Sequence, residues 1–156
     1  MISFSIPRFK DLHFQYLVLD FNGTLAADGK LLKGVAEKLN ALSELLEVHV
    51  ITADTFGKAK EQLENIKCNL KIISENDQTL QKLDYITKLG TDNVVAIGNG
   101  RNDQLMLKHA SLGIALIQKE GASTETLLAS DIICTDILDA LDLLTNNKRL
   151  IATLRS

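Results

Sequence analysis

Short apolar runs alternate with amphipathic segments along the chain. Six runs are near-continuous rather than alternating, which is typical of strands that are buried on both faces of a sheet. These runs span residues 16–21, 48–52, 70–74, 93–98, 112–116 and 131–135. Between them, leucine, isoleucine, valine and alanine recur at three- and four-residue spacing, which predicts helices with one apolar side. These helical patterns cover residues 32–46, 59–66, 80–89, 105–110 and 137–144.

The order of these elements predicts the fold class. Repeated alternation of strand and helix is typical of a parallel sheet with helices on both faces. Because strand–helix–strand crossovers are right-handed, we expect an α/β fold, a doubly wound Rossmann-like three-layer sandwich with a mainly parallel sheet. No repeat, low-complexity tract or proline-rich linker interrupts the pattern, so residues 1–156 are predicted to form a single domain. The last stretch, 146–156, is interpreted as a terminal helix or tail.

The composition fits a soluble globular protein and does not favour a nucleic-acid or membrane partner. The 156 residues are 46% hydrophobic and 24% charged, and the formal net charge is −3. This acidic balance offers no electrostatic attraction for nucleic acid or anionic lipid, and no window approaches the roughly 18 apolar residues of a membrane span. Cys68 and Cys134 lie far apart in apolar surroundings, so we expect buried thiols in a cytoplasmic protein.

Three of the predicted strands end in polar segments, two of which contain glycine. These segments are Asp-Phe-Asn-Gly-Thr at 20–24, Thr-Ala-Asp at 52–54 and Gly-Asn-Gly-Arg-Asn-Asp at 98–103. In doubly wound sheets, ligands bind beyond the carboxyl ends of the strands, where loops and helix N-termini meet. We therefore expect the three segments to converge on one face of the domain and to form its functional site.

Asp20 is the central candidate for chemistry because it ends a buried strand and projects from a rigid element. A carboxylate in such a place can act as a nucleophile, as a metal ligand or as both. Gly23 allows a sharp turn that brings backbone N–H groups toward an anion. Asp103 supplies a second acid, and oxygen donors of this kind suit Mg²⁺. Thr52 offers a hydroxyl, and Lys82 offers a positive charge for phosphate oxygens.

Each of these residues also has a simpler explanation when it is taken alone. The Asn-Gly pair at 22–23 is a strong turn signal, and Thr52 suits a strand end. Asp54 can cap a helix that begins near Phe56, and Lys82 can be a solvated helix residue. The functional interpretation therefore depends on the complete set in its order along the chain.

The ordered set resembles the four motifs of the haloacid dehalogenase (HAD) superfamily of phosphotransferases. The first motif of that family, Asp-x-Asp-Gly-Thr, is similar to residues 20–24. Thr52 matches the second motif, a threonine or serine after an apolar strand, and Lys82 matches the third. The fourth, Gly-Asp-Gly-x-Asn-Asp, is similar to residues 98–103. The resemblance spans residues 16 to about 144 and implies a HAD-like fold.

Within this superfamily, the chain most resembles the phosphorylation domain of P-type ATPases. There the second motif reads Thr-Gly-Asp, to which Thr-Ala-Asp at 52–54 is similar. The segment between Asp20 and Thr52 has room for a helix and little else. The resemblance therefore implies a HAD-like domain without a cap domain, whose open site can be covered by homo-oligomerisation.

The resemblance also implies a phosphohydrolase or phosphotransferase with roles for particular residues. Asp20 attacks the phosphoryl group of a small phosphorylated molecule and forms an aspartyl-phosphate. The implied catalytic residues are Asp20, Asn22, Thr52 and Lys82. The implied phosphate-binding residues are Asp20, Gly23, Thr52, Ala53, Lys82 and Asn102. The implied ligands of Mg²⁺ are Asp20, Asn22 through its backbone carbonyl, Asn99 and Asp103.

Two asparagines depart from the family pattern. Asn22 stands where the phosphatases of this superfamily carry an aspartate that protonates the leaving group, and Asn99 stands at the first acidic position of the fourth motif. General acid–base assistance contributes typically about 10²–10⁴-fold, so we expect alkyl phosphate esters to be poor substrates. Acyl phosphates, phosphoanhydrides and aryl phosphates should be affected least. Asn99 removes a formal charge, so the affinity for Mg²⁺ should fall.

Two other functions stay open from the sequence. A non-catalytic or very slow relative of these enzymes binds a phosphorylated ligand or a protein partner in the same place. A receiver domain, which is phosphorylated on an aspartate at a strand end, has a similar doubly wound fold. Its acidic pocket needs neighbouring acids early in the chain, where Asp11 is the one candidate before Asp20, so this function is disfavoured.

Overall fold

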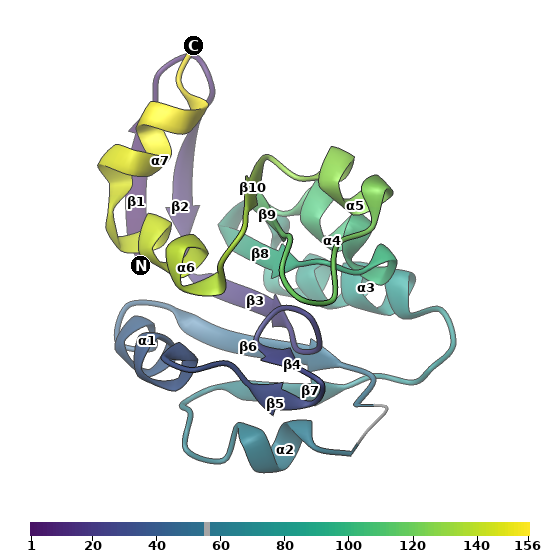
Figure 1. Ribbon diagram of the computed structural model, residues 1–156. Coiled ribbons are helices and arrows are strands. Elements are labelled where there is room, and N and C mark those ends of the chain that lie inside the picture. The colour runs from purple at the N-terminus through teal and green to yellow at the C-terminus, as the bar shows by residue number, and fades with distance from the viewer. Residues whose placement is uncertain (55–56) are drawn as a thin grey trace.

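The computed structural model describes residues 1–54 and 57–156, and its centre is a six-stranded parallel sheet (Figure 1). The strands are β3 (Tyr16–Asp20), β6 (Glu47–Thr52), β7 (Asn69–Ile72), β8 (Val94–Gly98), β9 (Leu112–Leu116) and β10 (Ile132–Cys134). Their order across the sheet is β10-β9-β8-β3-β6-β7, and each neighbouring pair is parallel. The predicted parallel α/β fold is confirmed.

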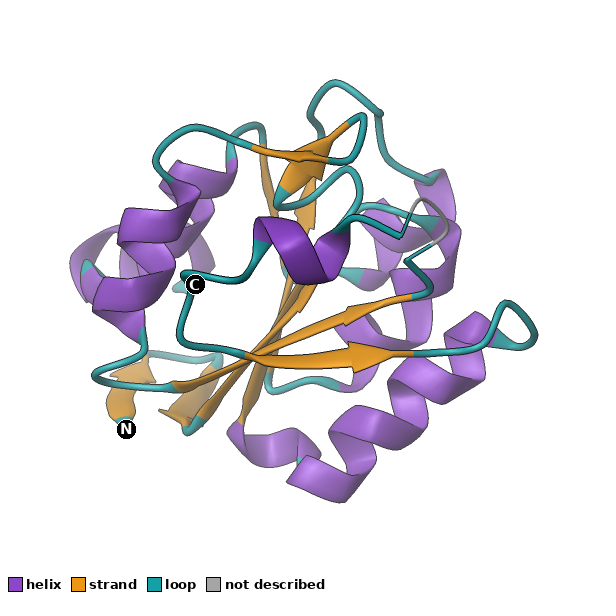
Figure 2. Cartoon of the chain, turned by 90° about the horizontal axis from the view of Figure 1, so that it is seen from below, coloured by secondary structure: helices purple, strands orange, loops and turns teal. Residues whose placement is uncertain are grey.

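Helices cover both faces of the sheet, as expected for a doubly wound fold (Figure 2). They are α1 (Val35–Leu42), α2 (Ala59–Gln62), α3 (Gln78–Leu89), α4 (Gln104–His109), α5 (Thr124–Ala129), α6 (Ile137–Thr145) and α7 (Asn147–Leu154), with 3-10 turns η1 (Thr91–Asn93) and η2 (Arg101–Asp103). Successive residues of β3 supply both cores. Leu17 and Leu19 join the apolar cluster of α1 and α6, whereas Val18 joins that of α3 and α4.

The inner strands are buried except at the first residues of β3 and β6, but the two edge strands are more exposed. Every residue of β8 and β9 is buried, in agreement with their near-continuous apolar pattern. In the edge strands, Ile72 of β7 is 47% exposed and Ile133 of β10 is 50% exposed. An apolar run therefore predicts burial on both faces correctly only for the inner strands. For β7 and β10 that expectation is wrong, because an edge strand has a neighbour on one side only.

The N-terminal segment forms a hairpin that the apolar runs did not predict. β1 (Ile2–Ile6) pairs antiparallel with β2 (Lys10–Phe14), and Arg8 adopts a positive φ of 61° in the turn between them. Leu12 and Phe14 are fully buried in the same cluster as α6 and Leu150 of α7. Figure 1 shows α7 beside this hairpin, so the C-terminal segment is a packed helix rather than a tail.

Two further elements lie outside the predicted patterns. A short antiparallel hairpin, β4 (Ala26–Ala27) and β5 (Lys30–Leu31), precedes the expected helix α1. The short helix α5 follows β9, where no apolar periodicity indicated one. The helix start expected near Phe56 lies outside the described residues, and α2 is described from Ala59.

The two cysteines, Cys68 and Cys134, are free thiols. They are half-buried, whereas buried thiols were expected from the sequence. Desolvation raises the pKa of the Cys68 thiol, and it does the same for Cys134, where the nearby acids Asp139 and Asp136 add to the effect. Both thiols are therefore less reactive than an exposed cysteine. Within residues 1–54 and 57–156, no helix combines the length and the apolar character that crossing a membrane requires.

The topology marks one place for a ligand. From β3 the chain progresses through β6 to β7 at one edge, and then β8 returns to the other side of β3 and leads through β9 to β10. The progression across the sheet thus changes direction between β3 and β8. In open α/β sheets, such a switch point leaves a crevice beyond the carboxyl ends of the two strands, and ligands bind there. β3 ends at Asp20, and β8 ends at Gly98.

Candidate active site

The loop after Asp20 is a tight turn held by its own backbone. The Phe21 carbonyl accepts hydrogen bonds from the N–H groups of Thr24, Leu25 and Ala26, at 3.2, 2.9 and 3.0 Å. Gly23 has a φ of +79°, and a Cβ at this position would lie 2.3 Å from Asn99 Nδ2. The turn therefore requires glycine on both conformational and steric grounds. It brings the loop after β3 directly against the loop after β8.

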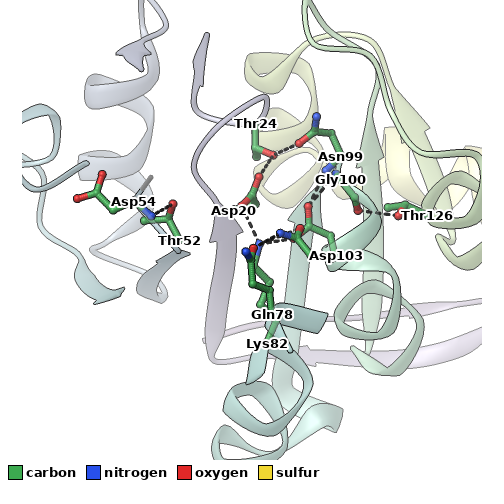
Figure 3. A network of polar contacts seen from close by, with 11 residues as sticks. Asp20, Thr24, Thr52, Asp54, Gln78, Lys82, Asn99, Gly100, Asp103 and Thr126 are labelled. Carbon is green, nitrogen blue, oxygen red and sulfur yellow. Dashed lines mark hydrogen bonds and ion pairs between the residues drawn. The ribbon is translucent and has the colours of Figure 1, made fainter. Parts of the chain in front are cut away.

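A buried lysine joins the two carboxylates of the site (Figure 3). Lys82 lies on α3, and its Nζ is 2.7 Å from Asp20 Oδ1 and 2.6 Å from Asp103 Oδ1. The lysine is 1% exposed, Asp103 is fully buried and Asp20 is 7% exposed. The simpler interpretation of Lys82 as a solvated helix residue is therefore wrong. Two acids and one ammonium group are enclosed together, with a net charge of −1 when all three are ionised.

This arrangement shifts the pKa values of the buried groups. Desolvation raises the pKa of Asp20 from 3.8 to about 6, and the like charge of Asp103 adds to the shift, while Lys82 opposes it. Burial alone would lower the pKa of Lys82, but its attraction to Asp103 and Asp20 outweighs burial and raises that pKa. Lys82 is therefore cationic throughout the physiological range, whereas Asp20 ionises less readily than an ordinary aspartate.

The raised pKa of Asp20 predicts a pH-dependent loss of stability in the metal-free protein. The pKa of Asp20 is about 6 in the folded state and 3.8 in the reference state, so the folded state binds a proton at Asp20 more tightly than the unfolded state does. The stabilisation of the folded state by this proton is fully present below pH 3.8 and is lost as the pH rises through about 6. We expect wild type to lose roughly 1–3 kcal/mol of unfolding free energy relative to Asp20→Asn between about pH 4 and about pH 7. Urea unfolding of both proteins with a chelator present measures the difference. A difference that stays constant with pH contradicts the prediction.

Asp103 is held in place by the loop that precedes it. Its Oδ2 accepts hydrogen bonds from the backbone N–H groups of Asn99 and Gly100, at 3.0 and 2.9 Å. Its Oδ1 faces Lys82. A Cβ at Gly98 would lie 2.5 Å from the Asp103 carboxyl group, so a side chain there would displace the acid. The glycines of the fourth motif thus let the backbone approach Asp103 closely.

Thr24 and Asn99 extend the polar network from Asp20 (Figure 3). The Thr24 hydroxyl lies 3.4 Å from both Asp20 Oδ2 and Asn99 Oδ1. These contacts are long, so among the described residues Oδ2 is the less engaged oxygen of Asp20. Asn99 donates from Nδ2 to the Gly121 carbonyl at 3.0 Å, which orients its Oδ1 toward Thr24.

The remaining expected residues line one cavity of about 330 Å³ beside Asp20. Its lining includes Asp20, Asn22, Thr52, Ala53, Asn99 and Asn102, together with Gln78, Gly100 and Glu120. Within the described part of the chain, the buried Oδ1 of Asn22 has no hydrogen-bond partner. The Thr52 hydroxyl accepts the Asp54 N–H at 3.0 Å, and Asp54 in turn accepts the Ala59 N–H at the start of α2. Asp54 therefore binds the first N–H group of α2, whose N-cap is Lys58, and the predicted start of a helix near Phe56 lies outside the described residues.

The segment after β9 supports both loops and was missed from the sequence. Gln118 donates from Nε2 to the carbonyls of Gly23 and Thr24, at 3.2 and 3.0 Å. The fully buried Thr126 donates to the Gly100 carbonyl at 2.7 Å. Gln78 on α3 was missed too, and it accepts a hydrogen bond from Asn102 Nδ2. A feature of the sequence could have indicated residues 118–126. The predicted strand at 112–116 is also followed by a polar segment that contains glycine, like the segments at 20–24 and 98–103.

Comparison with known proteins identifies the family. A family model described as haloacid dehalogenase-like hydrolase matches residues 67–137, which include Lys82 and the loop after β8. An uncharacterized protein of Methanocaldococcus jannaschii is 50% identical over 82 residues, which are 50% of this chain and 88% of that protein. A second uncharacterized protein of the same organism is 49% identical over 39 residues, 25% of this chain and 89% of its own length. The chain belongs to the haloacid dehalogenase-like hydrolases.

Solved structures with low sequence identity confirm the HAD-like fold. The 3-deoxy-D-manno-octulosonate 8-phosphate phosphatase of Moraxella catarrhalis, solved with magnesium, phosphate and KDO, has a TM-score of 0.71 at 18% identity, and the match covers 92% of this chain and 94% of that one. A phospho-aspartyl intermediate analogue of phosphoserine phosphatase has a TM-score of 0.66 at 15% identity, covering 85% and 99%. At these identities the likeness concerns the fold, and the chemistry of this HAD-like chain must be argued from its own residues.

Proposed function

We propose that this HAD-like protein is a Mg²⁺-dependent phosphohydrolase or phosphotransferase that acts on a small phosphorylated molecule through an aspartyl-phosphate at Asp20. One observation carries the proposal. The Asp20 carboxylate stands at the switch point of the sheet, is held by the buried Lys82 and lines a cavity of about 330 Å³. The names of the structural relatives, phosphatases of small phosphorylated molecules, support the same reaction class.

The chemistry begins with the less engaged oxygen of Asp20. Its Oδ2 donates an electron pair to phosphorus, the bond from phosphorus to the leaving group breaks, and the leaving group departs with that electron pair. Lys82 orients the carboxylate through Oδ1. It holds the phosphoryl oxygens together with Thr52, Ala53 and Asn102, which line the cavity beside Asp20, and with Gly23 in the turn after β3. Water then hydrolyses the aspartyl-phosphate, releasing inorganic phosphate and a proton to solvent.

The donor set around Asp20 fits Mg²⁺, although with a low charge. It consists of the Asp20 carboxylate, the Asn99 Oδ1 and the backbone carbonyl of Asn22. Asp20 and Asn99 both contact the Thr24 hydroxyl. The buried Asn22 Oδ1, which has no hydrogen-bond partner among the described residues, is a further oxygen of the site. Oxygen donors suit this ion. Across residues 1–54 and 57–156, no group of three or more His, Cys, Asp or Glu side chains could hold a metal, so an amide stands in for the usual acid. When bound, Mg²⁺ neutralises charge on the phosphoryl oxygens.

Asp103 is the fourth expected metal ligand, and its surroundings favour a supporting role. Both of its carboxylate oxygens already accept hydrogen bonds. Oδ1 accepts from Lys82, and Oδ2 accepts from the backbone N–H groups of Asn99 and Gly100. With two N–H groups on Oδ2, direct coordination by Asp103 is left with one lone pair of Oδ1, beside the Lys82 ammonium group, whose positive charge repels Mg²⁺. We therefore propose that Asp103 positions Lys82 and contributes negative charge, and that Asp20 and the two asparagines provide the direct ligands.

Asn22 limits the proposed substrates. An amide neither protonates a leaving group nor removes a proton from water. The substrates that suit this site are those whose leaving groups need no proton, above all acyl phosphates, and hydrolysis of the aspartyl-phosphate is slow. A slow second step favours transfer to an acceptor over hydrolysis. The resemblance to the phosphorylation domain of P-type ATPases agrees with this proposal and stays a prediction.

We also propose that residues 1–156 form a single HAD-like domain without a cap domain. Between Asp20 and β6, the chain forms the short β4–β5 hairpin and α1, which supports this proposal. A homo-oligomer can then cover the open site. The cytoplasmic location and the absence of nucleic-acid and membrane partners stay predictions from composition.

Hydrolysis of acetyl phosphate tests the proposed function. We expect phosphate release with added Mg²⁺ to exceed the spontaneous rate, and to return to it when a chelator removes the metal, because one carboxylate and two asparagines bind the ion only weakly. The assay follows inorganic phosphate over a range of Mg²⁺ concentrations. Release that does not depend on metal contradicts the metal assignment. No release and no binding of beryllofluoride favour instead a non-catalytic protein that binds a partner.

A further inference from the structure

A second cavity lies beside the candidate active site along the same edge of the sheet. It has a volume of about 410 Å³ and is bounded by the loop after β3, the β4–β5 hairpin and the segments after β9 and β10. The first cavity lies beyond β8, β3 and β6. Glu120 lines both cavities, and Gly23 of the second follows Asn22 of the first. A molecule whose phosphoryl group reaches Asp20 can therefore extend into the second cavity.

The lining of the second cavity combines a small apolar surface with two lysines. Ala26, Ala27 and Leu138 offer the apolar surface, Lys33 and Lys119 offer positive charges, and the acids Glu120 and Asp136 also belong to the lining. Small side chains leave room for a ligand at this place. Both lysines are exposed, so they contact a ligand from the rim of the cavity rather than from its floor.

Two other polar groups of this cavity, Asp136 and Gln118, are already engaged. Asp136 accepts hydrogen bonds from the N–H groups of Leu138 and Asp139 and caps α6. Gln118 accepts the Ile137 N–H through Oε1 and donates from Nε2 to the loop after β3. In the described part of the chain, neither Lys33 nor Lys119 forms an ion pair or a side-chain hydrogen bond. The lysines are thus the cationic groups of this cavity, and they can recognise an anionic ligand.

We propose that the second cavity binds the leaving-group part of the substrate, and that this part carries a second anionic group, a carboxylate or a phosphate, recognised by Lys33 and Lys119. This inference rests on the proposed function and names the substrate class for the same site. Glu120 at the junction disfavours an anion close to the phosphoryl group. The second anion therefore stands at the far end of the leaving group, separated from the phosphoryl group by a short apolar portion that lies on Ala26 and Ala27.

A matched pair of aryl phosphates tests this inference. 4-Carboxyphenyl phosphate and 4-carbamoylphenyl phosphate are similar in size and differ in the charge at the far end, and phenylene 1,4-bisphosphate places a phosphate there. We expect Lys33→Ala and Lys119→Ala each to lower kcat/KM for one of the anionic substrates by about 2- to 10-fold, mainly through KM, as exposed charge pairs allow. The carbamoyl substrate should be unaffected. Which anionic substrate is affected shows whether the cavity prefers carboxylate or phosphate.

The control is Lys30→Ala, because Lys30 is an exposed lysine of β5 that does not line the cavity. The inference is overturned if the lysine variants lower kcat/KM equally for charged and neutral substrates, or if they behave like Lys30→Ala. If wild type hydrolyses neither acetyl phosphate nor any of the three compounds, the proposed function fails. Whenever none of the three compounds is hydrolysed, the cavity is judged by calorimetric binding to Asp20→Asn, where equal affinities for the carboxyl, carbamoyl and bisphosphate compounds overturn the inference.

Discussion

Asp20→Asn lowers the rate of acetyl phosphate hydrolysis by at least about 10³-fold, because the amide cannot attack phosphorus. The substitution preserves the size of a side chain that is 7% exposed and leaves Lys82 paired with Asp103. The loss should therefore appear in kcat and not in folding. Phosphate release by wild type and variant under saturating Mg²⁺ measures the effect, and mass spectrometry of acid-quenched wild type should detect a phosphorylated Asp20.

The matched control for this prediction is Asp84→Asn. Asp84 is an exposed acid on the same helix as Lys82, and it pairs with Lys88. Its variant should retain wild-type activity. Equal rates for Asp20→Asn and wild type refute the nucleophile assignment. Phosphate found on another residue points to a different site.

Asn22→Asp increases the hydrolysis of an alkyl phosphate ester such as glycerol 2-phosphate by about 10²–10⁴-fold, the contribution typical of a general acid and base. Asn22 lines the cavity beside Asp20, and its buried Oδ1 has no partner among the described residues. A carboxyl group in its place can protonate the alkoxide and later accept a proton from water. Acetyl phosphate should gain much less in its first step, since its leaving group needs no proton. The rates at which the two substrates phosphorylate Asp20, followed before the steady state, measure the contrast, because steady-state rates also include the slow hydrolysis of the aspartyl-phosphate.

Asn65→Asp is the control for the added charge, because Asn65 is exposed and lies outside the site cavity. It should leave both rates unchanged. A general acid should also produce a decline in kcat for the ester at high pH, which wild type lacks. If Asn22→Asp hydrolyses the ester no faster than wild type, the argument from the missing acid is wrong.

The core of the fold could be predicted because its signals are local. Each inner strand is a near-continuous apolar run, and the elements alternate in a way that permits only a few topologies. The exposed strands β7 and β10 show the limit of this reasoning. Their apolar runs resemble those of β8 and β9, but exposure depends on the position of a strand across the sheet.

The N-terminal hairpin shows a different kind of omission. Ile2, Phe4 and Ile6 alternate with polar residues, which is the pattern of a strand with one buried face. A search for near-continuous runs passes over that pattern. The support from residues 118–126 was missed for another reason. The polar, glycine-containing strand end after residues 112–116 marked this segment, but its hydrogen bonds join groups far apart along the chain, such as Thr126 and Gly100. No local pattern specifies which of these groups meet.

The order of the motifs could be predicted from the sequence alone. Each candidate residue lies at or after the end of a predicted strand, or on a helix whose apolar residues recur at three- and four-residue spacing. Asp20, Thr52 and Asp103 were expected at one edge of a parallel sheet for that reason, although their individual roles stay proposals. The ionic core of the site required the folded molecule. Lys82 is 62 residues from Asp20 along the chain and 2.7 Å from it in space. Its burial and the raised pKa of Asp20 arise from low-dielectric surroundings that distant segments create together.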